Sequence, residues 1–150
     1  MAYDSRQDTL PHIVRVQELM AAICERLALR AELHDLSKLT EPEKSAFDAH
    51  APRRGSCVYG GETYNGHLAE MQAALAHHYA NNLHHPEHFE NGVNGMSLLD
   101  LIEMFCDWKA ASEKHRNGSL GRSIQINREH FELSEQLISI LENTRRELRW

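Results

Sequence analysis

Apolar side chains recur at helical spacing in the first quarter of the chain. Between Thr9 and Lys38 they return every three or four residues, at Ile13, Val16, Met20, Ile23 and Leu27. We expect Thr9 to cap this helix and Pro11 to lie in its first turn. A bend near residues 28–30 is expected to separate it from a second helix that ends near Lys38.

Further helices are predicted along the rest of the chain. The segment TEPEKSAFDAH is a short helix candidate, since Thr40 and Glu43 have the spacing of a capping box. Helical periodicity also covers three later segments, about 65–81, from Ser97 to about 115, and about 127–149.

Glycine and proline mark the intervening segments as loops. These loops cover residues 51–66, 82–95 and 116–127. The only strand candidate is the short stretch SIQI, within the last of them. The pattern therefore predicts an all-α fold, a single domain over residues 1–150 with about six helices around one core.

The composition is that of an ordinary globular domain. The chain has 150 residues, 41% hydrophobic and 25% charged, which is enough for one hydrophobic core. We see no signal peptide and no stretch near the roughly 18 apolar residues of a membrane span. The three cysteines are far apart and form no CxxC pair, which favours reduced thiols and a cytoplasmic location without membrane association.

The net charge of −6 bears on the type of partner. Nucleic-acid binding needs a basic face, so the sequence makes no strong case for it. A small anionic substrate held in a local basic pocket remains compatible with this charge.

Five histidines fall within the twelve residues HHYANNLHHPEH, residues 77–88. Imidazole binds transition metals and titrates near neutral pH, so a metal site and a pH-responsive surface are both candidates. A third interpretation is an ordinary helix end, where imidazolium stabilises the negative pole of the helix dipole.

Metal ligands to join these histidines occur at three other places. His34 and Asp35 are adjacent and offer a nitrogen and a carboxylate oxygen, which suits a divalent transition metal. His12 precedes them, and Asp107 lies on a largely apolar helix, where a carboxylate is costly without a cation. Each has a simpler explanation alone: a chance pair, a surface histidine and a salt-bridge partner. Their joint order on successive helices favours one site.

This order resembles the HD superfamily of metal-dependent phosphohydrolases. AELHDLSKL is similar to the helix of that family that ends in His-Asp, with a lysine shortly after. The segment HHPEHFENGVNGMSLLDLIEMFCDWKAA, residues 84–111, resembles the HD-GYP branch but lacks its GYP triplet, so the cyclic-dinucleotide substrate of that branch does not carry over. Most of the chain, from about His12 to Thr144, more closely resembles an uncharacterised family of small, mostly phage-encoded proteins. That resemblance implies a location in the host cytoplasm and brings no activity.

The resemblance implies an HD-like helical bundle and a ligand set for one ion. The implied ligands are His12, His34, Asp35 and Asp107, and a second ion would add two histidines bridged to the first site by Asp35. His78 is preferred over His77 because it continues a helical stripe, and His85 is weakly preferred over His84 because Pro86 follows it. The cofactor is predicted to be one or two divalent transition metals (Fe, Mn, Co, Ni or Zn), with Mg as a further option.

The resemblance and the ligand order together predict a phosphohydrolase for a small phosphorylated molecule, with a nucleotide preferred. Asp35 is the expected catalytic ligand, and Lys38 is expected to place its ammonium beside the substrate phosphate. Arg53 and Arg54 are candidates for a phosphate clamp. Lys38 could equally be a charge at a helix C-terminus, and the two arginines a solvated turn.

Two other functions stay open. The same ligands resemble those of HD-fold di-iron oxygenases, which oxygen consumption would reveal. Alternatively, the protein binds a nucleotide signal or a host factor without turnover. An apolar stripe on the last helix, from Phe131 to Leu141, closes either the core or a homodimer.

Overall fold

The structure, a computed structural model, describes residues 3–50, 71–115 and 117–150, and these contain helices and no strands. The fold is therefore all-α, as predicted. The chain divides into two compact units, Met1–His34 and Asp35–Trp150, and each is described by itself. The expectation of one domain over residues 1–150 stays a prediction. Within the described residues, no helix is both long and apolar enough to cross a membrane.

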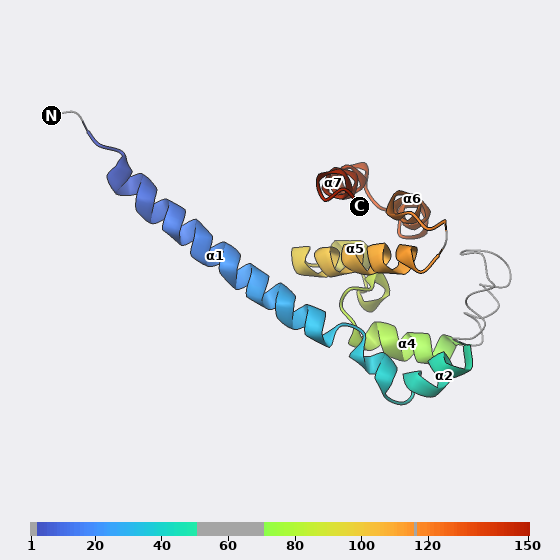
Figure 1. Cartoon of the computed structure of the whole chain (residues 1–150). Coiled ribbons are helices and arrows are strands. Elements are labelled where there is room, and N and C mark those ends of the chain that lie inside the picture. Colours follow the sequence, from blue (N-terminus) through green and yellow to red (C-terminus); the bar gives the residue numbers. More distant parts are fainter. Residues whose placement is uncertain (1–2, 51–70, 116) are drawn as a thin grey trace. The chain divides into compact units, whose positions relative to one another are not determined.

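The first unit is built on a single helix, α1 (Arg6–Leu33), blue in Figure 1. The predicted bend near residues 28–30 is wrong, because LALRAEL consists of strong helix formers with no breaker. The predicted start is also wrong. The N-cap residue is Ser5, and Thr9 lies inside the helix, where its hydroxyl donates to the Ser5 carbonyl.

The second unit begins with short elements that surround the histidine segment. They are η1 (Leu36–Leu39), α2 (Glu43–His50), α4 (Gln72–Asn81), η3 (Pro86–His88) and η4 (Gly92–Gly95). Helix α2 packs against α4, and η1 contacts both of them (Figure 1). Thr40 does not cap α2 as predicted, since its hydroxyl donates to the Ser37 carbonyl at the end of η1.

Three helices complete the second unit: α5 (Leu98–Glu113), α6 (Leu120–His130) and α7 (Glu135–Glu147). The predicted loop at 116–127 and the strand candidate SIQI are wrong, because most of this stretch is helix α6. Its buried side chains, Leu120, Ile124 and Asn127, lie on one face. Their burial outweighs the cost of about 1 kcal/mol that Gly121 imposes inside a helix.

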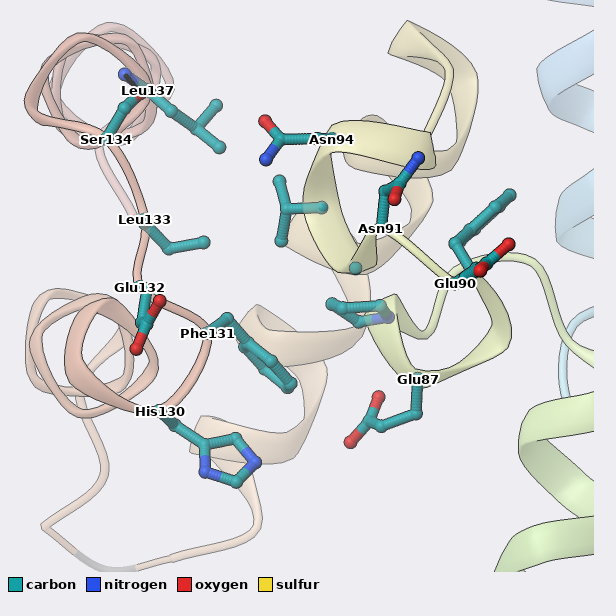
Figure 2. Close-up of a pocket in the computed structure, with 14 residues that line it drawn as sticks. Glu87, Glu90, Asn91, Asn94, His130, Phe131, Glu132, Leu133, Ser134 and Leu137 are labelled. Carbon is teal, nitrogen blue, oxygen red and sulfur yellow. Dashed lines mark hydrogen bonds between the residues drawn. The ribbon is translucent and has the colours of Figure 1, made fainter.

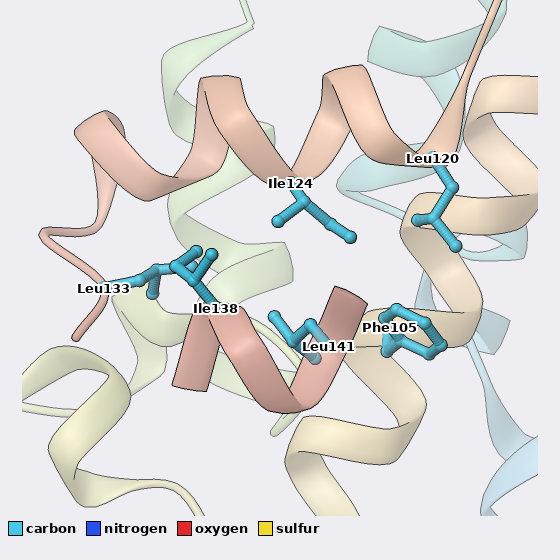
Figure 3. Close-up of a cluster of buried hydrophobic side chains, with 6 residues drawn as sticks. All are labelled: Phe105, Leu120, Ile124, Leu133, Ile138 and Leu141. Carbon is cyan, nitrogen blue, oxygen red and sulfur yellow. The ribbon is translucent and has the colours of Figure 1, made fainter. Parts of the chain in front are cut away.

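The hydrophobic core joins these three helices (Figure 3). Phe105 of α5 and Ile124 of α6 meet Ile138 and Leu141 of α7 there. Phe131 stacks on Trp108 beside this core, with the ring planes 2° apart. The apolar stripe of the last helix thus contributes to the core of its own unit. The predicted helix at 127–149 is wrong, since residues 131–134 separate α6 from α7, with Ser134 as the N-cap of α7.

Ser97 begins α5 as predicted. Its hydroxyl accepts from the Asp100 backbone N–H, and the Asp100 carboxylate accepts from the Ser97 N–H, which completes a capping box. Ser97→Ala is expected to lower the free energy of unfolding by about 1 kcal/mol in urea titrations, because one helix N–H loses its acceptor.

Ser119→Ala is the matched control, since Ser119 is the N-cap of α6 but its side chain makes no capping hydrogen bond. Equal losses in the two variants would contradict the assignment of this stability to the capping box.

Candidate metal centre

Asp35 presents its two carboxylate oxygens to different partners. Its backbone is in the left-handed region, with φ 59° and ψ 12°, which aspartate tolerates better than most residues. Oδ2 accepts a hydrogen bond from Lys38 Nζ at 2.6 Å. Oδ1 is buried and faces histidines: it lies 3.2 Å from His78 Nε2 and 3.6 Å from His84 Nε2.

Three histidines converge on this oxygen from α4 and the segment after it. His78 and His84 are buried, with exposed fractions of 1% and 2%, and His85 is largely buried. The Nε2 atoms of His78 and His85 are 2.9 Å apart. Ligand atoms of all four residues, Asp35, His78, His84 and His85, lie within 4.8 Å of one another.

Two further carboxylates contact the Nδ1 atoms of the buried histidines. Glu43, the first residue of α2, is fully buried and lies 2.9 Å from His78 Nδ1. Glu103 of α5 lies 3.1 Å from His84 Nδ1. Burial alone would raise the pKa of Glu43, but hydrogen bonds from His77 and Ser37 and the nearby His78 lower that pKa below its ordinary value.

His85 is held in its neutral form. Burial, together with the neighbouring His84 and His78, lowers its pKa from 6.5 to about 3, although Asp107 acts in the opposite direction. A neutral imidazole has a free lone pair at neutral pH, which is what metal binding requires.

Comparison with known proteins identifies the family of the chain. No curated protein and no solved structure matches the chain significantly. One family model matches residues 1–147, and its description is "Family of unknown function (DUF5662)". The chain belongs to DUF5662. Because the family has no assigned activity, the function of this member is argued from its own residues.

The DUF5662 structure brings together part of the predicted ligand set. His78, His85 and Asp35 meet, as described, and a carboxylate oxygen of Asp107 lies within 4.8 Å of one of Asp35. Lys38 contacts Asp35 directly. His77 instead turns to Glu43, with its Nδ1 2.8 Å from Oε1.

The remaining predicted site residues belong to the first unit or fall outside the described residues. His12 is an exposed residue of α1, and His34 is the C-cap of α1 and the last residue of the first unit. Their roles as ligands stay predictions. Arg53 and Arg54, the predicted phosphate clamp, fall outside the described residues.

Three residues of the DUF5662 centre were missed from the sequence. The sequence favours His85 over His84 only weakly, and the structure places both rings in the cluster, with centroids 4.1 Å apart. Glu43 was explained by its capping-box spacing from Thr40, and nothing in the sequence marked Glu103. The signal that could have found Glu43 is the adjacent pair His77 and His78, because a histidine buried on a helix needs a hydrogen-bond acceptor.

A separate pocket lies beside η3 in the second unit (Figure 2). Its volume is about 570 Å³, and apolar side chains such as Phe131 and Leu133 line it together with Glu87, Glu90 and Glu132. Its lining includes no lysine or arginine. This charge disfavours phosphate, so we do not assign the phosphorylated substrate to this pocket.

Metal-free protein is expected to lose stability as the pH falls below about 6.5 because of His85. In the unfolded chain this imidazole protonates near pH 6.5, whereas in the fold its pKa is about 3. Between these values the unfolded state binds more protons, so the free energy of unfolding decreases with falling pH and is unaffected by His85 above that window.

Urea unfolding at pH 7.5 and 5.0, in the presence of chelator, measures this effect. His85→Asn should show a smaller drop between the two pH values than the unmodified protein. An identical drop in both proteins would contradict the burial of a neutral His85.

Proposed function

We propose that this protein is a metal-dependent phosphohydrolase that acts on a small phosphorylated molecule, with nucleotides as the first class to test. One observation carries the proposal: Asp35 Oδ1 and the ring nitrogens of three histidines converge within 4.8 Å. Two of these histidines are buried, and a set of nitrogen and carboxylate donors is typical of transition-metal sites.

The distances between donor atoms fit a shared cation. Metal–ligand bonds of about 2.1 Å place two tetrahedral ligands roughly 3.4 Å apart. The three separations here are 2.9, 3.2 and 3.6 Å. Both atoms of the last pair, Asp35 Oδ1 and His84 Nε2, are buried. A cation between them would compensate this burial.

Asp35, His78, His84 and His85 would hold the first ion. Asp107, with a carboxylate oxygen within 4.8 Å of one of Asp35, would contribute to a second ion, with Asp35 as the bridge. Fe, Mn, Co, Ni and Zn suit these donors, and Mg is a further option. When bound, such an ion supplies a water of lowered pKa and charge neutralisation at a phosphoryl group.

Other features of the chain would orient the ligands, contact the substrate phosphate and exclude water. Lys38 holds Oδ2 of Asp35 and thereby orients Oδ1 toward the histidines. Its side chain is 31% exposed, so its ammonium can also reach a phosphate that enters from solvent. Burial of His78 and His84 excludes water from one side of the centre. This combination also supports the proposed kinship with HD phosphohydrolases.

Phosphate release from a panel of nucleoside mono-, di- and triphosphates tests the activity. The protein is loaded in turn with Mn²⁺, Co²⁺, Fe²⁺, Zn²⁺ and Mg²⁺, and His84→Ala is the negative control. Hydrolysis that needs both metal and His84 supports the proposal. No hydrolysis with any ion would refute it, and oxygen consumption by the iron-loaded protein would favour the di-iron oxygenase instead.

A further inference from the structure

Glu43 receives three hydrogen-bond donors from two separate elements. Its Oε1 lies 2.8 Å from His77 Nδ1, and its Oε2 lies 2.9 Å from His78 Nδ1. Ser37 of η1 donates its hydroxyl to Oε2 at 3.0 Å. A fully buried carboxylate is costly unless donors surround it, and here η1 and α4 supply them.

These contacts determine which nitrogen of His78 carries its proton. An ionised carboxylate only accepts, and Glu43 Oε2 lies closer to His78 Nδ1, at 2.9 Å, than Asp35 Oδ1 lies to Nε2, at 3.2 Å, so the geometry favours Nδ1 as the N–H of this ring. In the neutral ring, Nε2 then keeps its lone pair, and Nε2 is the atom that faces Asp35 and His85.

The surrounding donors agree with this assignment. The amide nitrogen of Asn82 lies 3.0 Å from His78 Nδ1, but its two hydrogens are used by two shorter contacts, to Ser37 Oγ at 2.9 Å and to the His78 carbonyl at 2.7 Å. The hydroxyl hydrogen of Ser37 is then available to Glu43. Glu103 has the same relation to His84, at 3.1 Å from Nδ1.

We propose that Glu43 is a positioning residue for the metal centre, which fixes the Nδ1–H tautomer of His78 and aims the Nε2 lone pair at Asp35. Through Ser37 it also aligns the turn that carries Asp35 with helix α4. This inference rests on the proposed metal centre for its effect on affinity, but the tautomer exists in the metal-free protein. A carboxylate that orients a ligating histidine raises metal affinity by about 10- to 100-fold in proteins.

The first test is the tautomer of His78 in unmodified, metal-free protein. Long-range ¹⁵N–¹H NMR distinguishes a protonated Nδ1 from a protonated Nε2. We expect His78 with the proton on Nδ1. A proton on Nε2 overturns the inference, and this result needs no variant.

The second test compares the affinity of Glu43→Gln and Glu41→Gln for Co²⁺ and Zn²⁺. Glu41 is exposed on the same segment and contacts Ser45 rather than a histidine, so it is the matched control. We expect the dissociation constant to rise about 10-fold or more in Glu43→Gln and to stay unchanged in Glu41→Gln. Circular dichroism and thermal unfolding check that both variants fold.

The outcomes separate the inference from the proposed function. If the unmodified protein binds metal and Glu43→Gln binds it equally well, the positioning role is overturned and the metal centre stands. If the unmodified protein binds no metal but His78 carries its proton on Nδ1, the proposed function fails while the orienting contact stands. If Glu43→Gln folds and binds metal more weakly while Glu41→Gln binds it unchanged, the result supports both the positioning role and the proposed metal centre.

Discussion

Replacing Asp35 by alanine is expected to abolish metal binding. Oδ1 of Asp35 is the atom that both His78 Nε2 and His84 Nε2 approach, at 3.2 and 3.6 Å. Without it, the cluster keeps its three imidazoles but loses its one carboxylate, whose charge would balance a cation. Metal analysis of protein purified without chelator should find one or two equivalents in the unmodified protein and none in Asp35→Ala.

Asp48→Ala is the control for this experiment. Asp48 is an exposed carboxylate of α2 that pairs with Lys44, so its loss removes the same charge from the same unit without touching the cluster. Full metal content in Asp35→Ala would show that the histidines bind metal without it. No metal in any of the three proteins would refute the proposed centre.

Metal should also stabilise the folded chain. A ligand at 100 times its dissociation constant adds about 2.7 kcal/mol to the free energy of unfolding. Chelator should therefore lower the melting temperature of the unmodified protein but not that of Asp35→Ala.

Replacing Ile124 by alanine is expected to destabilise the second unit by about 3 kcal/mol. Ile124 is fully buried between α5 and α7, and truncation there leaves a cavity as well as lost apolar burial. Urea unfolding followed by circular dichroism measures the change.

Ile140→Ala provides the comparison, because Ile140 is 52% exposed on α7. Its loss should cost well under 1 kcal/mol. Similar costs at the two positions would mean that α6 does not pack as described.

Local chemistry explains which elements the sequence could predict. Ser97 and Asp100 form their capping box within one turn of chain, so α5 was placed correctly. Helix α6 was missed because Gly118 and Gly121 are typical of a loop. Its helical form depends on burying Ile124 against residues that come later in the chain, and such distant contacts leave no local signal.

The residues of the candidate site also differ in whether the sequence carries a signal for them. Residue type and order single out Asp35 and the histidine cluster, and the resemblance to the HD superfamily implies His78 and His85 as ligands. His84 could not be separated from His85, because the segment between α4 and η3 is irregular and no periodicity tells which ring turns inward. Glu43 lies 35 residues from His78, and a local explanation for it as a helix cap was already available.

The left-handed backbone of Asp35 restricts which amino acids can occupy that position. Asparagine and glycine fit φ 59° with little strain, but neither carries a carboxylate. Glutamate carries one but would pay about 1 kcal/mol of backbone strain and bring a longer side chain. Natural variants that keep metal are therefore expected to keep aspartate here, and Asp35→Asn would separate the charge of this residue from its conformation.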